Sequence, residues 1–586
     1  MGERRPSVSE SDSTPASADP DAAPRRSRRP WLWYGLALVG CAVVTIALVA
    51  LLTTMFDRKQ EAKNPYVRVV DVDDNTTDPA VWGANWPRQF DGYSRTVDQT
   101  HTRYGGSDGS PTESRLSSDP WLKRMFAGYA FAIDFRERRG HAYMLADQRE
   151  TQRVQQRPQA GACLNCHASV VPTYRRVGLE GAGKTLTDAQ GFDWPAVFAG
   201  FEKLSVMSYV DAHRELLKTP DGSPNEVDPM PGGSSVATTT PANVTGHREG
   251  APTTKEALAS QTGEAHPVSC VDCHDPRSME LRVTRPAFVN GIRLLAQSKE
   301  PVPHLPSIQR WRDGNRKQPY DPNVDATRQE MRSFACAQCH NEYYCGPKVP
   351  IVHPWGNGLK ADQIESFYDN YKFPDGHRFY DWTHAETGAE VIKAQHPEFE
   401  TWSQGVHARS GVSCADCHMP YTRVGAAKVS DHHVRSPLLM INRSCQTCHP
   451  YPESELKARV DAIQGRTHDL MQRGGTALTD MLDAIRSAQA AGINSEQQQQ
   501  LFRLQRQAQW RLDFVSSENS MGFHAGQETA RVLGEAIDYA RQAQALAVSL
   551  RAPAAPQGGA GAPVEGVTPA ENAPPAPYQG LAPQPK

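Results

Sequence analysis

Apolar residues are scarce in this 586-residue sequence, because the hydrophobic types and cysteine together make up only 38% of it. The sequence also lacks an excess of either charge, since 63 basic and 66 acidic residues leave a formal net charge of −3. A balanced charge gives no indication of nucleic acid as a partner. No strand-rich region stands out, so we expect a mainly α-helical fold with extensive irregular loops.

Cysteine is infrequent too, yet ten of the 12 cysteines belong to five copies of Cys-x-x-Cys-His. In this motif the two thiols bond the vinyl groups of a porphyrin, and the adjacent histidine ligates its iron. Zinc knuckles and disulfides, the alternatives, do not need a histidine after every second cysteine. The copies read CLNCH at 163–167, CVDCH at 270–274, CAQCH at 336–340, CADCH at 414–418 and CQTCH at 445–449.

The motifs therefore predict a c-type cytochrome with five covalently bound haem c groups. Large apolar macrocycles would replace part of the side-chain core, which accounts for the low apolar content. The predicted thioether and proximal iron ligands are Cys163, Cys166, His167, Cys270, Cys273, His274, Cys336, Cys339, His340, Cys414, Cys417, His418, Cys445, Cys448 and His449.

A run without any charged residue lies at 31–56, after a polar stretch at 1–30 that we expect to be disordered. A helix of this length spans about 39 Å, enough to cross a hydrocarbon core of about 30 Å. Six arginines precede the run, so the positive-inside rule predicts a membrane anchor with the body on the periplasmic side of a bacterial inner membrane. A cleaved signal peptide is the alternative, although no clear A-x-A site follows.

The rest of the sequence divides into a body at 64–450, a helical region at 451–550 and an Ala/Pro/Gly-rich tail at 552–586. The tail is expected to be disordered. Within the body, 218–262 is rich in Pro, Gly, Ser and Thr, which predicts a long surface loop.

Long amphipathic helices are predicted for the C-terminal helical region, where apolar residues recur three and four positions apart. We expect breaks at Gly474, Gly475 and Gly492. The apolar faces of these helices should pack on the haem-binding body or on a second subunit.

The number of iron ligands decides whether a multihaem protein is an enzyme or an electron carrier. An iron with two histidine ligands can only pass electrons, whereas an iron with one open face can bind a substrate. Fifteen of the 20 histidines lie outside the motifs, more than enough for five distal ligands. The count alone therefore leaves both classes open.

Four flanking signatures accompany the motifs: RETQR at 149–153, NEYYC at 341–345, KAQHP at 393–397 and GFH at 522–524. With them, the sequence resembles the pentahaem cytochrome c nitrite reductases over roughly residues 80–545. The resemblance implies six-electron reduction of nitrite to ammonium at an open-face haem that four bis-histidine haems supply with electrons. A membrane-anchored electron-transfer cytochrome, or a relative acting on hydroxylamine or sulfite, is the alternative.

In that family the first haem is catalytic, and an Arg, a Tyr and a His surround its open face. The matching residues are Arg153, Tyr343 and His396. An always-charged guanidinium suits the nitrite oxygens, and a histidine can donate protons as the N–O bonds break.

The resemblance also implies a calcium ion beside this site. It would be held by the side chains of Glu342 and Gln395 and by the backbone carbonyls of Tyr343 and Lys393. Such a hard cation prefers oxygen ligands and would raise the local positive potential for an incoming anion.

Four further histidines match the family's distal iron ligands. They are His432 for the second haem, His141 for the third, His524 for the fourth and His407 for the fifth. His433 is an alternative to His432.

Two positions depart from the family pattern. Most members bind the catalytic iron through a lysine in CxxCK, whereas this chain has His167, as in a CxxCH variant of the family. Cys345 stands where an aromatic residue is usual, which we interpret as a small packing change. The expected partners are a quinol-oxidising membrane cytochrome or a small cytochrome as electron donor, and a second copy of the chain as a homodimer.

Overall fold

The computed structural model describes residues 30–63, 68–97, 101–105, 114–136, 140–188, 191–219, 265–314, 316–425 and 427–551. The stretches predicted as disordered at 1–30 and 552–586, and the loop predicted at 218–262, lie outside these residues except at their edges. The chain falls into two compact units, one made of the segment before residue 68 together with 423–428, and the other of the rest.

Helix α1 (Pro30–Lys63) contains the whole predicted apolar run and continues beyond it. Its apolar side chains are exposed along its length, from Trp31 to Phe56. By length and composition, the segment 31–59 can cross a membrane, and a signal sequence near an N-terminus would have the same properties.

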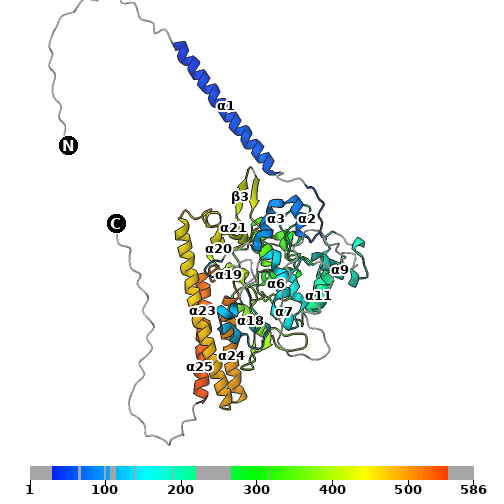
Figure 1. Cartoon of the computed structure of the whole chain (residues 1–586), viewed down its shortest axis with the longest axis vertical. Helices are drawn as coiled ribbons and strands as arrows, with labels where there is room; N and C mark the ends of the chain where they lie inside the picture. The colour runs from blue at the N-terminus through cyan, green and yellow to red at the C-terminus, as the bar shows by residue number, and fades with distance from the viewer. Residues whose placement is uncertain are drawn as a thin grey trace, which may run out of the picture. The chain divides into compact units, whose positions relative to one another are not determined.

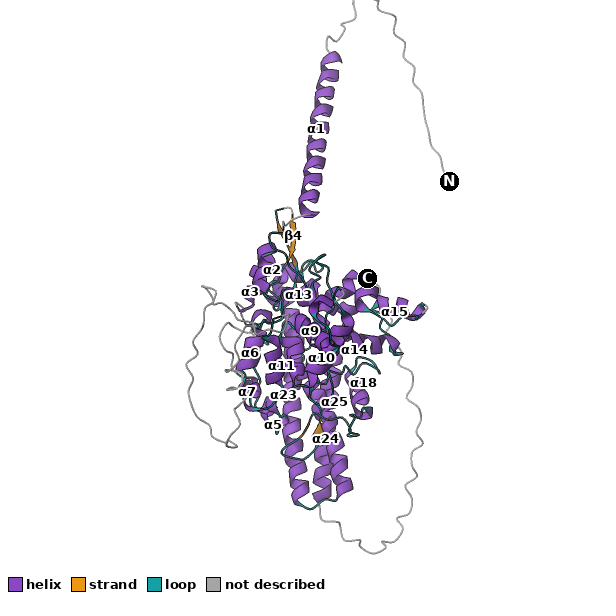
Figure 2. Cartoon of the chain, turned by 90° about the vertical axis from the view of Figure 1, so that its right-hand side faces the viewer, coloured by secondary structure: helices purple, strands orange, loops and turns teal. Residues whose placement is uncertain are grey.

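Short helices joined by irregular loops make up the part of the second unit that precedes the C-terminal helices (Figures 1 and 2). Before residue 220 they are α2 (Pro79–Asn85), α3 (Pro87–Ser94), α4 (Arg115–Ser118), α5 (Trp121–Met125), α6 (Met144–Glu150), α7 (Gln152–Gln156), α8 (Leu164–His167), α9 (Val171–Gly181), α10 (Trp194–Val206) and α11 (Tyr209–Leu216). Between residues 265 and 445 they are α13 (Cys270–Cys273), α14 (Pro286–Gln297), α15 (Pro306–Asp313), α16 (Pro322–Asp325), α17 (Arg328–Ala337), α18 (Ala361–Asn370), α19 (Glu398–Gln404), α20 (Val406–Arg409), α21 (Cys414–His418) and α22 (Ile441–Ser444).

In the described part of the chain, the strands form two short two-stranded sheets, of which the β1–β2 pair is antiparallel (Figure 2). They are β1 (Trp382–Thr383) with β2 (Glu390–Val391), and β3 (Tyr421–Val424) with β4 (Ala427–Ser430). The prediction of a mainly α-helical fold with extensive irregular loops is therefore confirmed.

Two of the haem motifs begin with a local capping signal. In α13 and α21 the residue before the first cysteine is a serine, and an aspartate follows three positions later. The carboxylates of Asp272 and Asp416 accept hydrogen bonds of 2.8 Å from the backbone N–H of Ser269 and Ser413, respectively. This capping box fixes the turn that carries both thiols and the proximal histidine.

Three long helices form the C-terminal part: α23 (Glu453–Ala490), α24 (Ser495–Ser516) and α25 (Gly526–Arg551). They run side by side in both views (Figures 1 and 2). The predicted break at Gly492 occurs, because this residue has a φ of +85° just after α23. The breaks predicted at Gly474 and Gly475 are wrong, since α23 continues through both.

Close packing explains why glycine occupies the middle of α23. A Cβ on Gly475 would lie 2.5 Å from the indole ring of Trp121, and one on Gly474 would lie 2.9 Å from Leu512. The missing side chains let α5 and α24 approach the helix, so here the glycines serve packing rather than helix termination.

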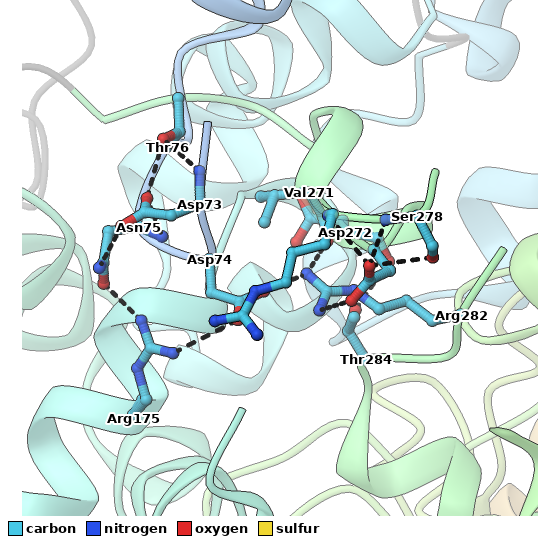
Figure 3. Close-up of polar contacts among 12 residues, drawn as sticks. Asp73, Asp74, Asn75, Thr76, Arg175, Val271, Asp272, Ser278, Arg282 and Thr284 are labelled. Carbon is cyan, nitrogen blue, oxygen red and sulfur yellow. Dashed lines mark hydrogen bonds and ion pairs between the residues drawn. The ribbon is translucent and has the colours of Figure 1, made fainter. Parts of the chain in front are cut away.

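A polar network ties the segment before α2 to the first two motif regions (Figure 3). Asp74 forms ion pairs with Arg282 at 2.7 Å and Arg175 at 3.8 Å. The guanidinium of Arg175 also donates to the side-chain oxygen of Asn75 at 2.5 Å. Because Arg175 is buried, these contacts satisfy a charge that would otherwise be costly to desolvate.

We expect Gly475→Ala to destabilise the protein by about 1–3 kcal/mol, because its Cβ would overlap the ring of Trp121. Gly534→Ala is the matched control: this residue is exposed in α25 with open space around it, and alanine should stabilise the helix by up to about 1 kcal/mol. The measurement is chemical unfolding followed by circular dichroism. Equal stability of the two variants would contradict the packing explanation.

Candidate functional site

Four of the five motif histidines face a second histidine in the described part of the chain. The ring centroids are 6.2 Å apart for His274–His432, 6.3 Å for His340–His141, 6.4 Å for His418–His524 and 6.3 Å for His449–His407. Two imidazoles bound through nitrogen to one metal at about 2 Å have centroids about 6 Å apart, since each centroid lies about 1 Å behind its nitrogen. The spacing therefore fits one iron between the rings of each pair.

The structure brings together all four pairs that the resemblance implies. For the second haem, it places His432 rather than the neighbouring His433 opposite His274. The proximal histidine of the first motif, His167, points its Nδ1 toward the carbonyl of Met144 at 3.4 Å.

Backbone carbonyls orient several of these rings. They accept from Nδ1 of His274 at 3.0 Å, of His418 at 3.1 Å and of His432 at 3.1 Å. A bond at Nδ1 fixes the tautomer and leaves Nε2 for a metal.

His340 has two histidine neighbours, because the ring of His396 also lies 6.3 Å from it. Oε1 of Glu398 lies 4.0 Å from Nδ1 of His340 and 3.9 Å from Nδ1 of His396. Glu398 therefore lies near the Nδ1 atoms of both rings.

The third motif contacts three others. The thiol of Cys339 lowers the pKa of Cys166 in the first motif, and the thiol of Cys336 lowers the pKa of Cys414 in the fourth, so these sulfurs lie close together. The amide of Gln338 donates to the backbone carbonyl of Asp272 in the second motif at 3.2 Å. The third haem position is therefore the junction between the first, second and fourth.

Arg153 and Tyr343 both lie beside the thiols of the first motif. Arg153, on α7, is buried and acts electrostatically on Cys163, and the buried Tyr343 interacts with the thiol of Cys166. Burial raises the pKa of Tyr343 well above its usual range, so the phenol keeps its proton as a donor.

His396 belongs to a segment that packs against the NEYYC stretch. Its backbone N–H donates to the carbonyl of Asn341 at 3.3 Å, and the N–H of Gln395 donates to Oε2 of Glu342 at 2.6 Å. The KAQHP and NEYYC stretches, about 50 residues apart in sequence, thus lie side by side.

Buried carboxylates characterise the predicted calcium site. Oε1 of Glu342 accepts from the hydroxyl of Tyr368 at 2.9 Å, and Oε1 of Glu400 accepts from the backbone N–H of Glu342 at 2.9 Å. Burial raises the pKa of Glu342 well above its usual range and that of Glu400 to about 8. A divalent cation beside these carboxylates would offset this cost, which agrees with a calcium ion next to Glu342.

The ammonium of Lys393 points elsewhere. It bonds Asp513 at 3.0 Å and the hydroxyl of Ser517 at 2.7 Å in a fully buried pair. The side chain of Lys393 is therefore engaged away from the predicted calcium ligands, so the resemblance's backbone contact stays a prediction.

Three side chains near these groups were not predicted from the sequence. The ring of Phe131 lies 4.1 Å below the guanidinium carbon of Arg153 and 4.9 Å from the ammonium of Lys393. Glu398 approaches His396, and Glu518 bonds His524. Glu398 stands two residues after His396 and could have been found by that spacing, whereas Phe131 and Glu518 carry no such signal.

Cys345 is closer to the first haem position than a packing change requires. Its Sγ lies 3.9 Å from Sγ of Cys163, one of the two thiols predicted to bond the porphyrin.

A sequence model of the family described as cytochrome c552 matches residues 78–181 and 251–575. The chain belongs to the cytochrome c552 family. Membership implies covalently bound haem c, in agreement with the five motifs.

A cytochrome c-552 of Parabacteroides distasonis is 29% identical over 531 residues, which are 89% of this chain and 85% of the relative. One of Bacteroides thetaiotaomicron is 38% identical over 285 residues, which are 48% of this chain and 52% of the relative.

Among solved structures, this cytochrome c552 family member is similar to the catalytic subunit of cytochrome c nitrite reductase from Desulfovibrio desulfuricans. The TM-score is 0.59 and the identity is 25%, over 82% of this chain and 88% of the other. That subunit has two calcium sites.

For the distal ligands, we expect His432→Ala to convert one haem from low-spin to high-spin while all five haems are retained, because the iron bound by His274 would lose its opposite imidazole. His433→Ala is the matched control and should keep that haem low-spin. Electron paramagnetic resonance and pyridine haemochrome analysis give the two readouts. A spin change in the His433 variant alone would reverse the assignment.

Proposed function

We propose that the protein reduces nitrite to ammonium at the haem carried by Cys163 and Cys166, and that the other four haems deliver the electrons. The observation that carries this proposal is the position of Arg153 and Tyr343 beside the first-motif thiols. A buried guanidinium with a phenol donor is suited to a small anion, and an electron wire does not need it. Family membership and the likeness to a cytochrome c nitrite reductase support the same activity.

The reaction consumes one nitrite, six electrons and eight protons and yields one ammonium ion and two water molecules. Haem c bound at these motifs would supply the iron for nitrite binding and the path for the electrons. Arg153 binds the nitrite oxygens through its N–H groups, and Tyr343 adds a hydroxyl donor. His396 donates protons to the oxygens that leave, because imidazole changes its charge near neutral pH.

The stacking of Arg153 on Phe131 holds the guanidinium in place. The ring is itself packed against Tyr129 and Phe135, at centroid distances of 5.7 and 5.0 Å. A cation over an aromatic face in a buried setting is stabilised by about 2 kcal/mol. A fixed guanidinium loses less freedom when the anion binds.

Electrons would reach the first haem through the third. The contacts of the third motif with the first, second and fourth support this path, because short separations favour transfer between haems. The donor is a quinol-oxidising membrane cytochrome or a small cytochrome, and α1 keeps the body on the periplasmic side of the inner membrane close to it. The long C-terminal helices would form a homodimer.

Calcium would bind Glu342 and Gln395 through their side chains, and Tyr343 and Lys393 through their carbonyls. The buried carboxylates of Glu342 and Glu400 support this assignment. The ion would hold the NEYYC and KAQHP stretches together and favour an anion nearby.

For the reaction, we expect reduced viologen to drive near-complete conversion, with one ammonium formed per nitrite. Arg153→Ala should lower kcat/KM for nitrite by about 100-fold or more, as the loss of a charged donor does. His396→Ala should lower kcat by about 100-fold, the loss of a general acid. Both variants should retain five haems.

Two surface residues provide matched controls. Arg149→Ala changes the exposed first arginine of RETQR, and His377→Ala changes an exposed histidine. Both should keep normal rates. An entirely low-spin spectrum with no nitrite reduction would favour an electron carrier, and a preference for hydroxylamine or sulfite would favour the other alternative.

For calcium, we expect a chelator to lower the melting temperature, since a cation bound only to the folded state stabilises it by mass action. Calcium should restore the lost stability, whereas magnesium should not, because it requires a smaller octahedral site. Metal analysis should find less calcium in Glu342→Gln than in the parent protein. Full stability and no calcium before chelation would contradict the assignment.

A further inference from the structure

His524 differs from three other haem-facing histidines in the group that its Nδ1 contacts. Nδ1–H of His524 donates to Oε1 of Glu518 at 2.5 Å, whereas the Nδ1 atoms of His274, His418 and His432 donate to neutral backbone carbonyls. If each facing pair holds one iron, the fourth iron has one ligand backed by a carboxylate, and the second iron has two ligands backed by carbonyls.

The carboxylate of Glu518 is fixed just after α24. Its Oε2 accepts from the hydroxyl of Ser520 at 2.7 Å, and its Oε1 also accepts from the backbone N–H of Ser520 at 3.2 Å. The Ser520 hydroxyl in turn accepts from the backbone N–H of His524 at 3.0 Å. The turn therefore holds the carboxylate and the imidazole in one rigid arrangement.

This contact is shielded from solvent. The side chain of Glu518 is 1% exposed, and in the described part of the chain His524 is the group with which it forms an ion pair. Water and salt therefore screen its charge little, so a negative charge here acts strongly on the ring and on anything the ring binds.

We propose that Glu518 holds the midpoint potential of the fourth haem below that of the second. A carboxylate at Nδ1 makes the imidazole a stronger electron donor, and its charge favours the ferric iron, which carries one more positive charge than the ferrous iron. Both effects make reduction less favourable. The second iron has two ligands whose Nδ1 atoms donate to backbone carbonyls, so its ferric state is not stabilised in this way.

The third haem also differs from the fourth in how close a carboxylate lies to Nδ1 of its histidine ligand. Oε1 of Glu398 lies 4.0 Å from Nδ1 of His340, farther than Glu518 lies from His524, and accepts from the amide of Asn519 at 2.5 Å, so its charge acts more weakly on the third haem. An electron on the fourth haem therefore passes downhill to the third, which contacts the catalytic position. This consequence rests on the proposed function; the effect on the potential rests only on the ligand pair His418–His524.

The test is a redox titration of the full-length protein with all five haems, followed by electron paramagnetic resonance. Glu518→Gln keeps the shape and the acceptor oxygen and removes the charge. We expect the potential of one low-spin haem to rise by about 59 mV or more, a tenfold change in its ferric-to-ferrous ratio. That haem is the one whose low-spin signal is lost in His524→Ala.

Glu528→Gln, which removes a carboxylate paired with Arg531 in α25, is the matched control and should leave all potentials unchanged. An unshifted fourth haem, or an equal shift of all five, would overturn the proposal. If the Glu518→Gln protein lacks a haem, Ser520→Ala is used instead, because it removes a hydrogen bond to the same carboxylate. A smaller rise in the potential of the same haem would support the proposal, and an unchanged potential would refute it. A shift without nitrite reduction would refute only the proposed function.

Discussion

Paired imidazoles are the constraint on which the rest of this structure depends. Each facing pair joins a motif histidine to one from another part of the chain, as when His418 meets His524. Such contacts fix long-range segments that contain little regular structure of their own. They also explain how a chain with few apolar residues folds around its haems, because ligand geometry replaces part of the packing that a larger apolar core would supply.

The third motif gives these pairs a common centre. It touches the first, second and fourth motifs, and Glu398 next to it approaches His396 at the predicted catalytic face. In the proposed mechanism, electron supply and proton supply would therefore converge on neighbouring residues of two segments. The buried pair Lys393–Asp513 joins one of these segments to α24, so the C-terminal helices help to hold this segment in place.

Local signals in the sequence predicted the haem motifs, the long helices and the facing histidines, because these depend on short spacings or on a family pattern. Packing partners were beyond such signals. Gly474 and Gly475 were interpreted as helix breaks, since nothing nearby in sequence shows that Trp121 and Leu512 need their space. Phe131 and Glu518 act through contacts with Arg153 and His524 that only the tertiary structure defines.

The two sulfurs of Cys163 and Cys345 lie 3.9 Å apart, although 182 positions separate them along the chain. If the two sulfurs moved closer together, they could reach the S–S bond length of a disulfide, about 2 Å. A crosslink there and a thioether at Cys163 exclude each other. Attachment of the porphyrin at Cys163 would therefore have to precede any oxidation of this pair to a disulfide.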